Sequence, residues 1–214
     1  MYYPPPSPPS GVQFVRVIGA FSGFVPTMIA LCKNFGWTRV ATVSELGEVY
    51  SATMAVFRAK AKTNGIAITS INSLTEGGDG AAVISSLADT GTRITLVQGG
   101  PVMLRNLLCS AYRGGMVGRE YAWLLPGTWR NEWWLPVAGE WKSTTPSGQK
   151  PCNATEMTLA ASGYVSVHSF ENTSDTQCSD RYLFVYSDIH LFCVRRYALL
   201  WSLYDSSPRS LRMP

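Results

Sequence analysis

The sequence has few residues of the kinds that build metal centres and nucleic-acid surfaces. It contains two histidines, His168 and His190, and none of its five cysteines forms a Cys-x-x-Cys pair, so the ligand spacing of a zinc site is missing. Only 15% of the residues are charged, and the basic ones are scattered instead of forming a stripe that could follow phosphates. We therefore expect no metal, no other cofactor and no nucleic-acid partner.

Residue sets for catalysis and for cofactor phosphates are missing as well. Neither histidine has a serine or cysteine nucleophile and a carboxylate grouped with it, so nothing supports a hydrolase. The glycine-rich loop 75–80 does not directly follow a predicted strand and lacks the spacing of a dinucleotide fingerprint. Its Asp79 is predicted to cap the helix that follows. We expect a protein that is not an enzyme.

Long apolar runs are also absent. The apolar blocks within 182–204 are interrupted by Asp188, Arg195 and Arg196, which leaves no span near the roughly 20 residues that a membrane helix needs. Residues 1–13 are rich in proline and have no basic region followed by an apolar one, so they are interpreted as a disordered leader and not as a signal peptide. We expect no transmembrane helix in this chain.

Alternating strand and helix patterns fill the middle of the chain. β-Branched and apolar runs predict strands, and apolar residues at helical spacing predict helices between them. The predicted strands are 38–43, 66–71, 93–97 and 121–125, with a weaker one at 14–18, and the predicted helices are 27–34, 48–63, 81–88 and one from Pro101 to the glycines at 114–115. Repeated units of this kind are typical of a doubly wound parallel α/β sheet. No matching unit is expected to return to the sheet after residue 173.

Two sequons indicate the cellular compartment. Asn153-Ala-Thr155 and Asn172-Thr-Ser174 are N-glycosylation acceptors, although such tripeptides also arise by chance. Both follow Cys152, which makes an oxidising extracellular context plausible. We therefore expect glycosylation at Asn153 and Asn172.

Three stretches carry a resemblance to a known family: Phe35-Gly-Trp-Thr-Arg-Val40, the segment 121–134 with three tryptophans in six residues, and the segment from Cys152 to Val165. Together they resemble the extracellular ligand-binding region of metabotropic GABA (GABA-B type) receptors, which are class C G-protein-coupled receptors. The resemblance implies one incomplete lobe of a type I clamshell similar to periplasmic binding proteins. Residues 14–173 would form mostly the second lobe, 174–214 a divergent tail, and the parent receptor would display this fragment at the extracellular face of the plasma membrane.

The resemblance also implies a ligand, a partner and a disulfide. The family binds small amino-acid-like ligands and works as a heterodimer of subunits. In the GABA-binding subunit the second lobe supplies a tyrosine and a tryptophan, whose positions are taken here by Gly100 and Thr128, while Ile18 stands where that subunit has a histidine. We therefore expect a partner-type subunit that does not bind GABA. A bridge between Cys109 and Cys152 is implied by the family pattern, and Cys32 is expected to be buried and free.

Ligand-cleft candidates are expected where parallel strands end, because α/β sheets bind ligands at that edge. They are Ser44, Gly100, Thr128 and Trp129. Each has a second interpretation: Ser44-Glu45 as a solvated loop, Gly99-Gly100 as a tight turn that needs glycine instead of a carboxylate site, and the tryptophans as a brace for their loop. Trp129, Trp133 and Trp134 share that ambiguity.

Two other functions compete with the receptor. A solute-binding protein of the same clamshell fold could serve a transporter, and an enzyme could use a related sheet. The sequons and the implied bridge favour the receptor over the first, and the missing acid/base and phosphate motifs disfavour the second. The tail is expected neither to cross a membrane nor to fold onto the sheet, which would leave an exposed edge prone to association.

Overall fold

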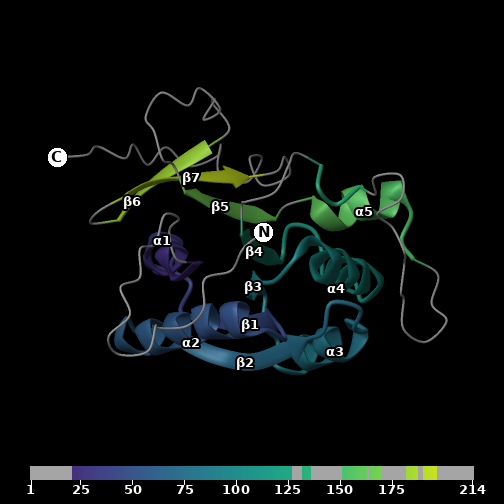
Figure 1. The fold of residues 1–214 in the computed structure, drawn as a ribbon, viewed down its shortest axis with the longest axis horizontal. Helices are drawn as coiled ribbons and strands as arrows, with labels where there is room; N and C mark the ends of the chain where they lie inside the picture. The colour runs from purple at the N-terminus through teal and green to yellow at the C-terminus, as the bar shows by residue number, and fades with distance from the viewer. Residues whose placement is uncertain are drawn as a thin grey trace, which may run out of the picture.

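The computed structural model describes residues 21–126, 132–135, 151–162, 164–169, 182–187 and 190–196. Within them, a seven-stranded sheet has the order β2-β1-β3-β4-β5-β7-β6 (Figure 1). The strands are β1 Arg39–Glu45, β2 Ala67–Leu74, β3 Ile94–Gln98, β4 Ala122–Pro126, β5 Val165–Ser169, β6 Tyr182–Ser187 and β7 His190–Arg196. The helices are the 3-10 helix η1 Phe21–Phe24 and α1 Val25–Asn34, α2 Glu48–Thr63, α3 Ala81–Asp89, α4 Pro101–Arg113 and α5 Ala154–Ala161.

The first five strands are parallel. The alternating pattern predicts the first four of them as parallel units, whereas β5 was not predicted. Each predicted strand or helix between residues 25 and 126 is present, with ends shifted by at most a few residues. Local signals fix several ends: Pro101 lies in the first turn of α4, and Asp79 Oδ1 accepts a hydrogen bond from the Ala81 amide at the start of α3. The predicted α/β sheet is confirmed, whereas the weak strand at 14–18 lies outside the described residues.

Two hydrophobic cores lie on opposite faces of the sheet. Successive side chains of a strand point to opposite faces, and accordingly Val40 packs in one core while Ala41 packs in the other. The first core joins the sheet to η1, α1 and α2, and the second joins it to α3, α4 and α5. Helices therefore cover both faces of the sheet, as the doubly wound fold requires.

Cys32 lies on α1 within the first core and forms no disulfide, as expected. Burial raises the pKa of its thiol to about 12 because the thiolate would lose its hydration. Cys32 is therefore neutral at physiological pH and packs as a small apolar side chain.

The C-terminal strands overturn one expectation. β7 pairs antiparallel with β5 from Val165↔Arg196 to Ser169↔Phe192, and β6 pairs antiparallel with β7. The expectation that this segment does not fold onto the sheet is therefore wrong. β7 lies between β5 and β6 in the sheet, so β6 is the edge strand on this side. In Figure 1 this pair of strands lies beside β5, on the side of the sheet away from β2.

No helix in the described part of the chain is both long enough and apolar enough to span a bilayer.

Candidate ligand-binding edge of the sheet

The candidate site lies where β1 and β3 end. These two parallel strands are neighbours, yet the chain leaves β1 into α2 on one face of the sheet and leaves β3 into α4 on the other. Such a reversal of direction opens a crevice at the carboxyl ends of the strands, and open α/β sheets bind their ligands there. Two of the predicted cleft residues lie near these strand ends: Ser44 is in β1 and Gly100 follows β3, and their part in a cleft stays a prediction.

Glu45, the last residue of β1, connects this strand to the start of α4 by a hydrogen bond. One of its carboxylate oxygens, Oε2, accepts a hydrogen bond of 2.5 Å from the backbone N–H of Gly100. Gly100 is the N-cap residue of α4 and supplies no side-chain cap of its own. A carboxylate at a helix N-terminus is favoured by the helix dipole and by unpaired N–H groups. Glu45 therefore supplies a carboxylate acceptor at the start of α4.

A Cβ atom at either glycine of this turn would contact neighbouring side chains. A Cβ at Gly99 would overlap the Cε atom of Met103, so the turn is tight there. At Gly100 a Cβ would lie 3.3 Å from Glu45 Oε2 and 3.7 Å from the hydroxyl of Tyr50, a residue in the first turn of α2. The Gly100 N–H group binds a carboxylate of the same chain, and neither interpretation of Gly99-Gly100 is decided by this contact.

We expect Glu45→Ala to lower the free energy of unfolding by about 1–2 kcal/mol, because it removes a charged acceptor from the start of α4. Glu45→Gln keeps an acceptor oxygen but not the charge, and should cost about half as much. Chemical denaturation followed by circular dichroism measures both. Glu76→Ala is the matched control, because Glu76 is exposed and only its backbone oxygen is hydrogen bonded. Equal stability of Glu45→Ala and Glu76→Ala would contradict the cap.

Polar side chains are buried just beneath the crevice. Ser44 is only 4% exposed and lies in β1 opposite Gln98 of β3, so its interpretation as part of a solvated loop is wrong. Strand alternation places Thr42, Ser44 and Gln98 on the sheet face covered by α1 and α2. Within the described residues, the Gln98 amide and the Thr42 hydroxyl have no hydrogen-bond partner. Buried polar groups are normally paired, so this end of β1 and β3 is more polar than a purely structural core requires.

The aromatic candidates separate into two groups. Thr128 and Trp129, like Ile18, lie outside the described residues, so their place at the cleft stays a prediction. Trp133 and Trp134 are buried and make edge-to-face contacts with each other and with Tyr164. The Trp133 indole N–H donates to the Tyr164 hydroxyl over 3.1 Å. These two tryptophans therefore brace their loop against the core.

A buried arginine fixes the same loop from the other side. Arg105, on α4, donates hydrogen bonds from Nε and Nη2 to the backbone oxygen of Trp133, at 2.9 and 2.7 Å. Only 7% of Arg105 is exposed. A carbonyl held by two donors of one guanidinium has a fixed orientation, and the loop is thereby attached to the helix that begins at the crevice.

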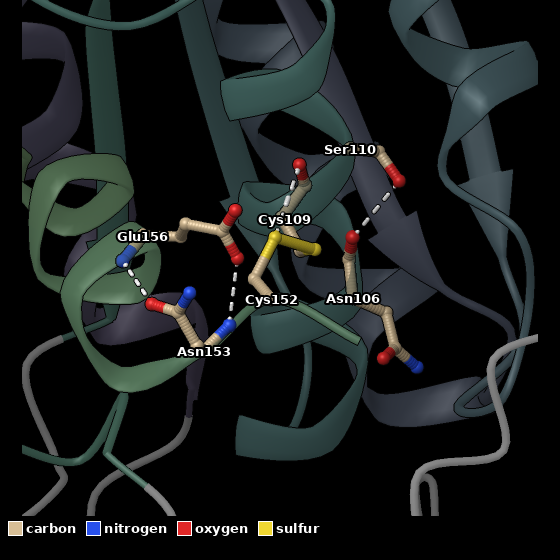
Figure 2. The surroundings of a disulfide bond; sticks show 6 residues. All are labelled: Asn106, Cys109, Ser110, Cys152, Asn153 and Glu156. Carbon is tan, nitrogen blue, oxygen red and sulfur yellow. Dashed lines mark hydrogen bonds between the residues drawn. A yellow bond between two sulfur atoms is a disulfide. The ribbon is translucent and has the colours of Figure 1, made fainter. Parts of the chain in front are cut away.

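A disulfide joins α4 to the start of α5. Cys109 and Cys152 are bonded, with their Cα atoms 5.8 Å apart and a sequence separation of 43 (Figure 2). Both are buried in the core that includes Trp133 and Trp134. The bridge implied by the family pattern is therefore confirmed.

Comparison with known families agrees with this geometry. Residues 8–183 match the family model described as the receptor family ligand binding region. The chain belongs to this family. The ends of β1 and β3 lie within the matched residues.

GABA-B receptor subunits are among the relatives of this ligand-binding region. It is 28% identical over 141 residues to gamma-aminobutyric acid type B receptor subunit 1 of Mus musculus, and 26% identical over 164 residues to subunit 2 of Homo sapiens. Subunit 1 of Caenorhabditis elegans is 27% identical over 144 residues. These alignments cover 66%, 77% and 67% of the chain, but only 14%, 16% and 15% of the relatives. The predicted resemblance to GABA-B type receptors is confirmed for this part of the relatives' length.

Sequence reasoning missed the role of Glu45 in this ligand-binding region. The available signal was a carboxylate at the end of one predicted strand and a side-chain-free helix start, Gly100-Pro101, at the end of another. That signal becomes specific only when β1 and β3 are known to be neighbours.

Proposed function

We propose that this chain forms part of the extracellular ligand-binding region of a GABA-B-like receptor subunit, and that it does not itself bind GABA. One observation carries the second half of the proposal: the position of the family's tyrosine contact is Gly100, whose N–H is already bonded to Glu45. The subunit would therefore be of the partner type. It would act in a heterodimer with a GABA-binding subunit.

The chemistry of the crevice supports this assignment. A tyrosine contributes a ring for packing and a hydroxyl for hydrogen bonding, and a glycine contributes neither. GABA carries a carboxylate, which Glu45 would repel from the start of α4, because like charges at short distance destabilise each other. A clamshell also gains affinity by enclosing its ligand between two lobes, so a single lobe is expected to bind weakly even with a favourable edge.

The receptor context follows from the relatives by analogy. These relatives are receptor subunits, which favours a receptor over an enzyme or a transporter-associated binding protein. We place the subunit at the plasma membrane with this region outside the cell, and we expect the remaining parts of the receptor to supply signalling.

We expect no saturable binding when micromolar GABA is titrated into the purified chain in a calorimeter. The Gly100→Tyr and Thr128→Trp double variant should not bind either, because the second lobe alone cannot enclose the ligand. A saturable heat signal from the unmodified chain would contradict the proposal.

A chimeric receptor tests the partner-type assignment. Residues 21–169 of this chain replace the corresponding segment of either subunit in a GABA-B heterodimer, and GABA-evoked G-protein activation is measured at matched surface expression. We expect the response to be lost when the GABA-binding subunit carries the segment and kept when its partner does.

A matched variant separates lost contacts from misfolding in that chimera. With both lobes present, Gly100→Tyr and Thr128→Trp in the GABA-binding subunit should restore part of the response, provided that the Glu45 carboxylate moves by a few tenths of an ångström to admit the new Cβ. A full response from the unmodified GABA-binding chimera would show that Gly100 does not prevent GABA binding.

A further inference from the structure

Asn153 lies between the disulfide and α5, and only the oxygen of its side-chain amide is hydrogen bonded within the described residues. The side-chain oxygen Oδ1 of Asn153 accepts a hydrogen bond of 2.9 Å from the backbone N–H of Glu156. In return, Glu156 Oε2 accepts one of 2.8 Å from the backbone N–H of Asn153 (Figure 2). This reciprocal pair is a capping box at the start of α5. The side-chain nitrogen Nδ2 makes no hydrogen bond to any residue in the described part of the chain, and Asn153 is exposed.

The free atom is the one that N-glycosylation modifies. In that reaction the asparagine amide nitrogen attacks C1 of an oligosaccharide carried on a polyprenyl pyrophosphate. The new N–C bond forms, the C–O bond to the pyrophosphate breaks, the amide loses one proton and the lipid pyrophosphate leaves. The carbonyl oxygen takes no part as a leaving group, so Oδ1 keeps its lone pairs for the helix cap.

We propose that Asn153 carries an N-linked glycan on Nδ2 while its Oδ1 continues to cap α5. The sequon Asn153-Ala-Thr155 supplies the acceptor pattern. Thr155 is exposed on the first turn of α5 and does not belong to the capping box. The carbohydrate would therefore stand outside the corner that Cys109 and Cys152 hold together.

This inference rests on the extracellular location proposed above, but it is tested independently of it. The full 214-residue chain is secreted from mammalian cells behind a heterologous signal sequence, so that it meets the oligosaccharide donor whatever its natural location. Glycans are released with peptide N-glycosidase in heavy-oxygen water, which converts each occupied asparagine to a labelled aspartate. Mass spectrometry of the peptide that contains residue 153 then reports occupancy.

Four variants separate the site from the cap. Thr155→Ser should keep the label at residue 153 and Thr155→Val should lose it, with the capping box unchanged in both. Asn172→Gln removes the other sequon and should leave the label at 153 in place. Asn153→Asp keeps a capping oxygen but cannot be glycosylated. An unlabelled residue 153 in secreted wild-type protein would overturn the proposed site.

Thermal melting tests the second half of the proposal. The glycosylated wild-type chain and Asn153→Asp should melt at similar temperatures, whereas Asn153→Ala should melt lower because α5 loses its cap. If the glycosylated chain melted as low as Asn153→Ala, the glycan would have displaced the cap. If a variant is not secreted, the same peptide is analysed from the intracellular glycosylated fraction, where loss of the label in Thr155→Val has the same meaning.

Discussion

Replacing Cys109 with serine is expected to lower the free energy of unfolding by about 4 kcal/mol. The bridge to Cys152 closes a loop of 43 residues, and in the chain-entropy account a crosslink of that size removes about this much conformational freedom from the unfolded chain. The loop contains β4 and the braced tryptophans, so its closure restricts a segment that must find its place in the core. Urea denaturation of the oxidised chain and of the variant, followed by circular dichroism, measures the difference.

Three controls identify the bridge as the cause. Cys152→Ser, and the double variant with both serines, should each lose as much as Cys109→Ser, because the bond is lost once in all three cases. Cys32→Ala should cost only about 1 kcal/mol, since Cys32 is buried but unpaired. The wild-type chain in reducing agent should match the double variant. A double variant that lost twice as much as either single one would indicate packing, and not the crosslink, as the source.

The second large effect is expected at Trp133. We expect Trp133→Ala to lower the free energy of unfolding by about 3–5 kcal/mol, the range found when large buried aromatic side chains are truncated. Its ring centroid lies 6.3 Å from that of Trp134 and 6.0 Å from that of Tyr164, in edge-to-face arrangements that favour aromatic pairs. Far-ultraviolet circular dichroism is the appropriate readout, because removing a tryptophan changes the fluorescence signal directly.

Smaller substitutions at the same place divide this effect into its parts. Trp133→Phe keeps a buried ring but loses the indole N–H, and Tyr164→Phe loses the hydroxyl that accepts from it. Each should cost about 1 kcal/mol for the hydrogen bond, with a further loss for the smaller ring in Trp133→Phe. The double variant should cost less than the sum, because the two residues share one bond. A loss below 1 kcal/mol for Trp133→Ala would mean that the loop does not depend on its indole.

The part of the fold between residues 25 and 126 was predictable because local and global signals agree there. Helix α2 has the predicted bounds, Glu48–Thr63, since Asn64-Gly65 stops the apolar pattern where the helix ends. The strands end within a few residues of their predicted positions. Strand order was not predictable to the same extent, because β1 has β2 on one side and β3 on the other, which no local pattern specifies.

Four later elements, α5, β5, β6 and β7, have no counterpart among the predicted ones. Helix α5 has only eight residues and too little apolar periodicity to be recognised, although its capping signal, Asn153 followed by Glu156, was present in the sequence. The apolar blocks at β6 and β7 are short, which argues against a membrane span but does not by itself indicate antiparallel pairing. Antiparallel partners can lie close in sequence and need no helix between them.

The location of the candidate site stays a prediction, and its contacts were not predictable from the sequence. Ser44 and Gly100 were identified because carboxyl ends of parallel strands meet at one edge. The hydrogen bond from Gly100 to Glu45 spans 55 residues and depends on how far one side chain reaches across the crevice. The roles of Trp133 and Trp134 could not be decided from the sequence either, because the burial of a tryptophan depends on the tertiary fold around it.

Helix α4 is attached to Glu45, to the tryptophan loop and to the start of α5. The N–H group of its N-cap residue, Gly100, donates to Glu45. Arg105, in the middle of the helix, binds the tryptophan loop, and Cys109, near its end, is bonded to Cys152 at the start of α5. Gly100 and Cys109 are about 13 Å apart along the axis at the rise of an α-helix. Because these three attachments are on one helix, a displacement of α4 would also move the tryptophan loop and the start of α5.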